Sequence, residues 1–262
     1  MHSPRKAEKR SAGFNRLAVL PLFLIIVFGV IIFSGFQKKQ FKTGTVKLVF
    51  NNTVRSIPLI LDTVTYKNIF GEPFTVTKFR YYISNISLEK NGKVQTEEES
   101  YHLIDASDSN SLRFSFSLPV GDYNSINFLL GVDSLRNCSG AQTGALDPLK
   151  DMFWTWNSGY VMAKLEGGSD SSKALKRIEY HIGGYKGDNN VLQKIKLHTA
   201  SPIIVSDGKE TTIMIETDIS KWWQDMDKIR ISENPVCTTP GVLAKRISSN
   251  YSNMFGIQKI LH

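Results

Sequence analysis

The sequence predicts a mainly β protein: an antiparallel Greek-key or β-sandwich domain with a short C-terminal helix, preceded by one N-terminal transmembrane helix. Three observations lead to this prediction. About ten short segments between residues 44 and 216 alternate apolar and polar residues, which is typical of half-buried strands. Turn-forming residues separate these segments at close spacing, as in antiparallel all-β folds. Helical periodicity is confined to the end of the chain.

The first 42 residues carry nearly all of the excess positive charge. The formal net charge is +8, and residues 1–42 contain eight Lys or Arg and one Glu. The remaining body is therefore close to neutral. This distribution argues against a nucleic-acid-binding protein, whose basic residues would be spread over a folded surface. It is typical of the flanks of a membrane segment.

Residues 17–33 form an uncharged apolar segment of 17 residues, at the short end of what spans a bilayer. Because more cations precede it than follow it, residues 1–16 should be a basic cytoplasmic tail. We expect a signal anchor at 17–33, a linker at 34–43 and an exported domain at 44–262, in a single-pass inner-membrane protein facing the periplasm. Cleavage as a signal peptide stays an alternative, although no small-x-small site follows Phe33.

The first predicted strand, residues 44–51, shows the pattern well, since Val46, Leu48 and Phe50 alternate with polar neighbours. Similar segments follow at 57–61, 79–88, 101–104, 113–118, 126–132, 160–165, 177–182, 191–197, 203–205 and 211–216. Asn91-Gly92, just after the third segment, predicts a hairpin turn.

Helical structure is expected only near the C-terminus. Asp218 can cap a short turn that carries Trp222 and Trp223. Residues 241–257 have apolar side chains at roughly helical spacing, so we expect a helix there with one face docked on the sandwich.

A long connection joins the predicted strands 126–132 and 160–165. It contains Met152-Phe153-Trp154-Thr155-Trp156, in which Trp154 and Trp156 would share one side of an extended backbone. A connection of this length within a compact domain is usually functional. The alternative is that these rings close one end of the β-core.

The sequence contains no catalytic motif that we can identify, neither a Gly-x-Ser-x-Gly elbow nor a His-Glu-x-x-His pair nor a phosphate loop. We therefore do not expect an enzyme. His181 ends an alternating segment beside a glycine turn, where an imidazole can bind copper, zinc or iron. The alternative is a histidine bonded to a backbone carbonyl. An oxidising compartment would favour a disulfide between Cys138 and Cys237, although their distance cannot be read from the sequence.

Four stretches resemble the MbnP-like domain family over roughly residues 45–257. They are FRYYISNISL (79–88), the central block GVDSLRNCSGAQTGALDPLKDMFWTWNSGYVMAKLEG (131–167), YHIGGYKG (180–187) and NYSNMF (250–255). This is a family of exported, copper-associated proteins found beside methanobactin genes and more widely in bacteria.

The resemblance implies a periplasmic or secreted β-sandwich that binds copper through histidine. In some similar proteins, a partner di-haem enzyme of the peroxidase type oxidises a tryptophan to kynurenine. By motif, the tryptophan candidates here are Trp154 and Trp156, and the best histidine candidate is His181. Kynurenine would add an amine and a carbonyl to a site lined by rings, where a monovalent copper ion needs few ligands.

The chain departs from the family at Cys138, where methanobactin-associated relatives commonly carry a histidine. A Cys138 thiolate would be a good ligand for monovalent copper. If Cys138 instead pairs with Cys237, the resemblance leaves His102 or a backbone group as the second ligand beside His181.

Two hypotheses follow. The first is a membrane-anchored, extracytoplasmic copper-binding protein that sequesters or delivers the metal without catalysis. The second is a non-catalytic binding or structural module of the same fold that has lost the metal site.

Overall fold

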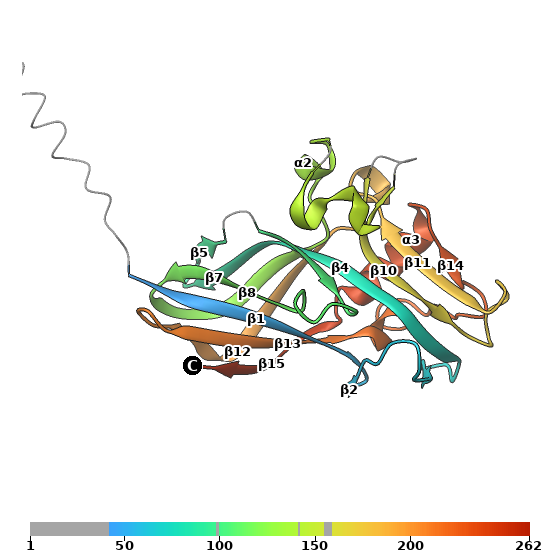
Figure 1. Cartoon of the computed structure of the whole chain (residues 1–262), viewed down its shortest axis with the longest axis horizontal. Coiled ribbons are helices and arrows are strands. Elements are labelled where there is room, and N and C mark those ends of the chain that lie inside the picture. Colours follow the sequence, from blue (N-terminus) through green and yellow to red (C-terminus); the bar gives the residue numbers. More distant parts are fainter. Residues whose placement is uncertain (1–41, 98–99, 141, 155–158) are drawn as a thin grey trace, which may run out of the picture. The chain divides into compact units, whose positions relative to one another are not determined.

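Two β-sheets packed face to face form the domain (Figure 1). The computed structural model describes residues 42–97, 100–140, 142–154 and 159–262. The predicted tail, the anchor at 17–33 and nearly all of the linker lie outside the described residues, as does Trp156. Among the residues that the structure describes, no helix is long and apolar enough to cross a membrane.

Most of the described chain is strand, as the sequence predicted. The strands are β1 (Thr43–Val54), β2 (Ile57–Pro58), β3 (Tyr66–Lys67), β4 (Pro73–Lys90), β5 (Lys93–Thr96), β6 (Tyr101–Asp105), β7 (Arg113–Pro119), β8 (Gly121–Leu130), β9 (Phe153–Trp154), β10 (Gly159–Gly168), β11 (Arg177–Gly183), β12 (Gln193–Val205), β13 (Glu210–Asp218), β14 (Val236–Cys237) and β15 (Phe255–Leu261). The helices are α2 (Ser134–Asn137) and α3 (Val242–Tyr251), with 3-10 turns η1 (Gly144–Leu146), η2 (Pro148–Lys150), η3 (Gly187–Asn189) and η4 (Ile219–Trp222).

Within the described chain, the larger sheet follows the order β12-β8-β4-β10-β11-β14, with short strands added on β4 and β10. The smaller sheet follows the order β15-β13-β1-β2, and β7 also pairs with β1. The pairing of β1 with β13 is parallel, and so is that of β11 with β14, so both sheets are mixed rather than purely antiparallel. Alternation in β1 records which face is buried and carries no information about the direction of its neighbours.

The core lies between the two sheets. Val46, Leu48 and Phe50 of β1 are buried, as their alternation predicted. Across the interface, β4 contributes Tyr81, whose ring lies 6.2 Å from that of Phe50 and 5.8 Å from that of Phe255 on β15. Between the register shifts of β4, the residues Phe79, Tyr81 and Ile83 therefore face the core, and the intervening Arg80 and Tyr82 face outward.

The register of β4 shows where the long connection leaves the sheet. Tyr81 pairs with β10 and β6, and Ile83 pairs with β8 and β6. Because β6 occupies one edge of β4 at both positions, β8 and β10 must share the other edge, one after the other. The connection between β8 and β10 therefore starts and ends at a break opposite Tyr82.

The C-terminal region contains less helix than the sequence predicted. Asp218 caps η4 as expected, and Trp222 and Trp223 at the end of this turn are buried. The helix α3 ends at Tyr251, and the rest of the predicted segment 241–257 turns into β15, which pairs with the edge of β13. The predicted strand 57–61 is also shorter, since only β2 forms there.

Candidate metal site

Residues 131–158 connect β8 to β10, and the described part of this connection, residues 131–140 and 142–154, lies over the outer face of the larger sheet. Tyr82 on β4 points toward it, because its neighbour Tyr81 faces the core. The Gly131 N–H donates to the Tyr82 carbonyl at 2.9 Å, and Tyr82 Oη donates to the Ala145 carbonyl at 3.1 Å. Tyr82 therefore holds both the start and the middle of the connection.

Helix α2 ties the start of the connection to its end. The side chain of Asp133 caps the helix by accepting hydrogen bonds from two backbone N–H groups. Asn137 is buried and donates from Nδ2 to the carbonyls of Val132 and Asp133 at 2.5 and 3.0 Å. Its Oδ1 accepts the N–H of Tyr160 at 3.0 Å. One amide thus bridges the two chain segments.

Trp154 lies against the last residue of β11. The two-residue strand β9 pairs Trp154 with Gly159 of β10, and the Trp154 residue is only 7% exposed. A Cβ atom added to Gly183 would come within 2.7 Å of Trp154 Cη2 and 2.8 Å of the Tyr160 carbonyl oxygen. Glycine is therefore required at 183 for the indole to pack on β11.

His181 lies two residues before Gly183 and so shares its face of β11. Its Nε2 is 2.8 Å from Oε1 of Glu166 on β10. Burial raises the pKa of the Glu166 carboxyl, but the hydrogen bond from His181 and the charge of Lys78 outweigh this effect, so the net pKa is lowered. Nδ1 of His181 makes no hydrogen bond to the described residues and keeps its lone pair when Nε2 carries the proton.

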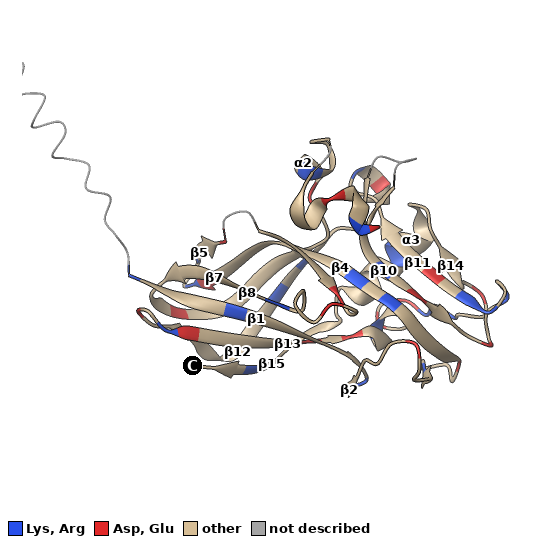
Figure 2. Cartoon of the chain, viewed as in Figure 1, with Lys and Arg blue, Asp and Glu red and all other residues tan. Residues whose placement is uncertain are grey.

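A buried lysine lies next to this pair. Lys164 pairs with His181 across the ladder, and its Nζ lies 3.0 Å from Asp151 Oδ2 and also donates to the Asp151 carbonyl. Lys78 approaches the same carboxylate at 3.1 Å. Burial raises the pKa of Asp151, yet the two ammonium groups lower it below its ordinary value. Asp151 belongs to the connection, so these ion pairs attach the second half of the connection to β4 and β10. Figure 2 shows charged residues on β4 and β11.

The structure does not bring His102 to His181. His102 pairs with Ile83 and so faces the core side of the larger sheet, where its ring stacks on Phe114 at 3.5 Å. Its Nε2 lies 3.0 Å from Glu97 Oε1. Three strand spacings separate β6 from β11, about 14 Å in total. Two imidazoles this far apart and on opposite faces cannot share one ion.

The structure contains both cysteines as free thiols, so the expected disulfide is not formed. Cys138 is the exposed C-cap of α2, and its Sγ lies 3.8 Å from Tyr185 Oη. Cys237 is buried in β14, and this burial raises the pKa of its thiol to about 11. An oxidising compartment permits a disulfide, but the pairing also requires the two Cα atoms to lie close together.

A protein-family model named MbnP matches residues 43–239. The chain belongs to the MbnP family. Among solved structures it is similar to MbnP from Methylosinus trichosporium, at 14% identity and a TM-score of 0.50, with 75% of this chain and 83% of that chain covered. At this identity the likeness shows the fold alone. No curated protein matches the chain.

The residues of this MbnP-family chain fit a copper ion only in part. No group of three or more His, Cys, Asp or Glu gathers in the part of the chain that the structure describes. Two suitable donors do lie at the connection end of β11: the carboxylate-bound imidazole of His181, and the free thiol of Cys138 beside Tyr185. A thiolate favours monovalent copper over hard cations such as calcium.

Several residues of the site are absent from the expectations drawn from the sequence. Glu166, Lys164 and Asp151 were not identified as neighbours of His181, and Asn137 was not recognised as a bridge. A signal for Lys164 exists, because it is the one charged residue in the apolar run 160–165 and such a charge needs a partner. Glu166 has no comparable signal, since only the pairing register shows that it faces His181.

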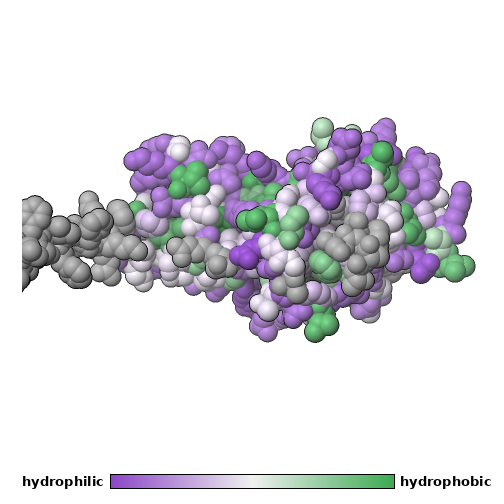
Figure 3. Space-filling view, turned by 90° about the horizontal axis from the view of Figure 1, so that it is seen from above, coloured by the Kyte–Doolittle hydropathy of each residue, from purple (hydrophilic) through white to green (hydrophobic). Residues whose placement is uncertain are grey.

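Among the described residues on the face seen in Figure 3, apolar side chains are scattered. In Figure 3, apolar residues on the face seen from above form separate patches among hydrophilic ones. Leu135 and Leu149, both in the connection, are 77% and 91% exposed. Single exposed apolar residues are ordinary on protein surfaces and require no partner.

Proposed function

We propose that this chain is a non-catalytic, extracytoplasmic copper-binding protein of the MbnP family that sequesters or delivers copper. In this proposal, residues 17–33 hold the domain at the membrane and His181 is the nitrogen ligand. One observation carries it: Glu166 binds Nε2 of His181 and leaves Nδ1 as a lone-pair donor, two residues from Gly183, on which the buried Trp154 packs. Histidine ligands in metal sites commonly have their other ring nitrogen held by a carboxylate in this way.

Cys138 is the proposed second ligand. In the structure its thiol is free and exposed, which is the state that a metal ligand requires. A thiolate and an imidazole form a soft donor set, which suits monovalent copper. Conversion of Trp154 or Trp156 to kynurenine by a di-haem peroxidase-type partner would add nitrogen and oxygen donors that an indole lacks.

The second candidate is a binding or structural module that keeps the fold and has no metal site. It is favoured by a specific observation: Nε2 of His181 and Nε2 of His102 each lie within hydrogen-bond distance of a glutamate. Such pairs also serve simply to satisfy partly buried histidines.

Metal content separates the two candidates. The fragment 43–262 contains the whole described core and is the protein to use. It is loaded anaerobically with monovalent copper, desalted and examined by native mass spectrometry, beside His181→Ala, Cys138→Ser and the control His102→Ala. Copper bound near stoichiometry by the parent and His102→Ala, and lost from the other two variants, supports the proposal.

Two further outcomes are informative. Copper at background in all proteins overturns the copper proposal and leaves the second candidate. Equal copper in all four proteins places the metal elsewhere and overturns the assignment of His181. Peptide mass mapping of residues 151–164 from the native source tests for oxidised tryptophan, and membrane fractionation of the full chain against the fragment tests the anchor.

A further inference from the structure

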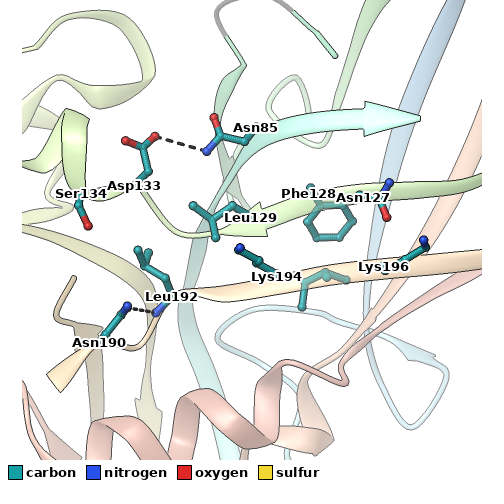
Figure 4. A pocket seen from close by; sticks show the side chains of 11 residues that line it. Asn85, Asn127, Phe128, Leu129, Asp133, Ser134, Asn190, Leu192, Lys194 and Lys196 are labelled. Carbon is teal, nitrogen blue, oxygen red and sulfur yellow. Dashed lines mark hydrogen bonds between the residues drawn. The ribbon is translucent and has the colours of Figure 1, made fainter. Parts of the chain in front are cut away.

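A second site lies on the outer face of β8 and β12, next to the first residues of α2. A pocket with a volume of about 590 Å³ opens there, within the size range of small-molecule sites. Figure 4 shows Leu129 of β8 and Leu192, just before β12, lying toward the same central space. Asn85 and Asp133 form one wall, and Asn190 lies at the opposite side.

The pocket exists because β4 bulges away from β8. Ser84 pairs with Leu129 and Ser87 pairs with Asn127, so β4 has one extra residue between the two pairs. Asn85 takes up this residue in the left-handed conformation, with φ of 52°. Bulges and left-handed residues other than glycine cost energy and occur preferentially at functional sites.

In the wall formed by Asn85 and Asp133, the negative charge of the Asp133 carboxylate is already compensated by hydrogen bonds within the protein. The Asp133 carboxylate caps α2, accepts a hydrogen bond from Tyr101 Oη, and lies 3.4 Å from Asn85 Nδ2. These hydrogen bonds lower the pKa of Asp133 against the opposing effect of its burial. The carboxylate is therefore ionised and occupied, and it has little capacity for a ligand cation.

The charge left without a partner in the pocket is positive. Lys196 lies 2.7 Å from Glu89 and is neutralised by it. Lys194 makes no ion pair with any described residue and lines the pocket directly beside Leu129, with which it pairs across the ladder. Asn190 uses its Oδ1 to accept the Leu192 N–H at 3.0 Å, which leaves its NH₂ group as a further donor.

From this arrangement we propose that the pocket binds a small organic carboxylic acid, as a separate molecule, whose remaining part is apolar. The apolar part lies over Leu129 and Leu192, and the carboxylate pairs with the ammonium group of Lys194. A charge-assisted hydrogen bond of this kind is stronger than one between neutral groups, and the adjoining apolar surface lowers the local dielectric. This inference does not depend on copper binding, because no copper ligand proposed above lines the pocket.

The test uses two probes of nearly the same shape, 1-naphthoate and neutral 1-naphthamide, titrated into the fragment 43–262 by isothermal calorimetry or ligand-observed NMR. The expected result is saturable binding of naphthoate that is about three- to fivefold tighter than that of naphthamide, as for an ion pair with an exposed lysine. In Lys194→Gln this preference should disappear, while Lys209→Gln, a matched change in the distant β12–β13 turn, should keep it. Leu192→Ser should weaken both probes.

Three results would overturn the proposal. They are the absence of saturable binding, equal affinity for the two probes in the parent, and an unchanged preference in Lys194→Gln. Because Lys194 and Lys209 are exposed, both variants should fold, and circular dichroism verifies this. Loss of copper binding with naphthoate binding intact would refute only the proposed copper function.

Discussion

The contact between Gly183 and Trp154 yields the sharpest prediction about stability. Gly183→Ala places a methyl group between the indole and the carbonyl oxygen of Tyr160, with 2.7 Å to Trp154 Cη2 and 2.8 Å to that oxygen. Both distances are too short for a carbon atom. The oxygen belongs to the β10 backbone and cannot retreat, so the indole must move outward.

The expected loss in the free energy of unfolding follows from the buried surface area of the indole that becomes exposed to water. A buried aromatic side chain removes about 150–250 Å² from water, worth about 4–6 kcal/mol at about 25 cal/mol per Å². Re-exposure of about half of this area lowers the free energy of unfolding by about 2–3 kcal/mol, within the range for overpacked cores. We expect this loss in urea unfolding of the fragment 43–262, followed by circular dichroism, together with a red shift of tryptophan emission.

Gly256→Ala is the matched control. Gly256 lies in β15, its φ is not in the left-handed region, and a Cβ atom there would meet nothing within 4 Å. This substitution should change the free energy of unfolding by less than about 0.5 kcal/mol. If Gly183→Ala matches this control and leaves the emission unchanged, the indole does not pack on β11 as described.

Three further predictions concern the connection. Asp151→Asn leaves the ammonium group of Lys164 without its carboxylate and should cost about 1–2 kcal/mol at pH 7, after allowance for the exposure of Asp151. Because the folded-state pKa of Asp151 is lowered, this difference between parent and variant in chemical unfolding should be full above about pH 5, where the unfolded carboxyl is ionised, and should be lost as the pH falls through the lowered folded-state pKa. Asn137→Ala leaves the buried Val132 carbonyl and the buried Tyr160 N–H without their partner, whereas the Asp133 carbonyl still accepts the backbone N–H of residue 137. It should lower the free energy of unfolding by about 2–3 kcal/mol, measured by urea titration. Iodoacetamide at pH 8 should label Cys138 in the folded protein and spare Cys237 until urea is added; protection of both, with a mass lower by two hydrogens, would restore the disulfide.

Burial patterns in this chain could be predicted from the sequence because they are local. Alternation in β1 reports directly which side chains face the core, and the same holds for β13. The direction of the β1–β13 pair could not be predicted, since it depends on residues more than 150 positions apart. The helix predicted at 241–257 was too long for a related reason. The apolar spacing was compatible with one long helix, but the last residues of this segment pair with the free edge of β13 as a strand.

The candidate site divides in the same way. Trp154 and His181 could be identified from the resemblance and from their place at strand ends, and the structure puts them on one face of β11. Glu166 could not, because its role arises from the register between β10 and β11. His102 was expected as a possible second ligand beside His181, but the register of β6 places it on the other face of the sheet.

The break opposite Tyr82 has a consequence for how such a protein can change. Leu130, the last residue of β8, pairs with Ile83 of β4. Ala163 of β10 pairs with Tyr81 on the same edge of β4. The two attachment points are therefore two residues apart along β4, or about 7 Å. A chain segment whose ends are already held this close can grow or shrink at small entropic cost, about 0.6 kcal/mol for each doubling in length. The larger sheet thus fixes both ends of the connection, and the length and sequence of the segment between them can vary without disturbing the strands. Side chains carried by that segment, Cys138 among them, can therefore be replaced without any change to a strand.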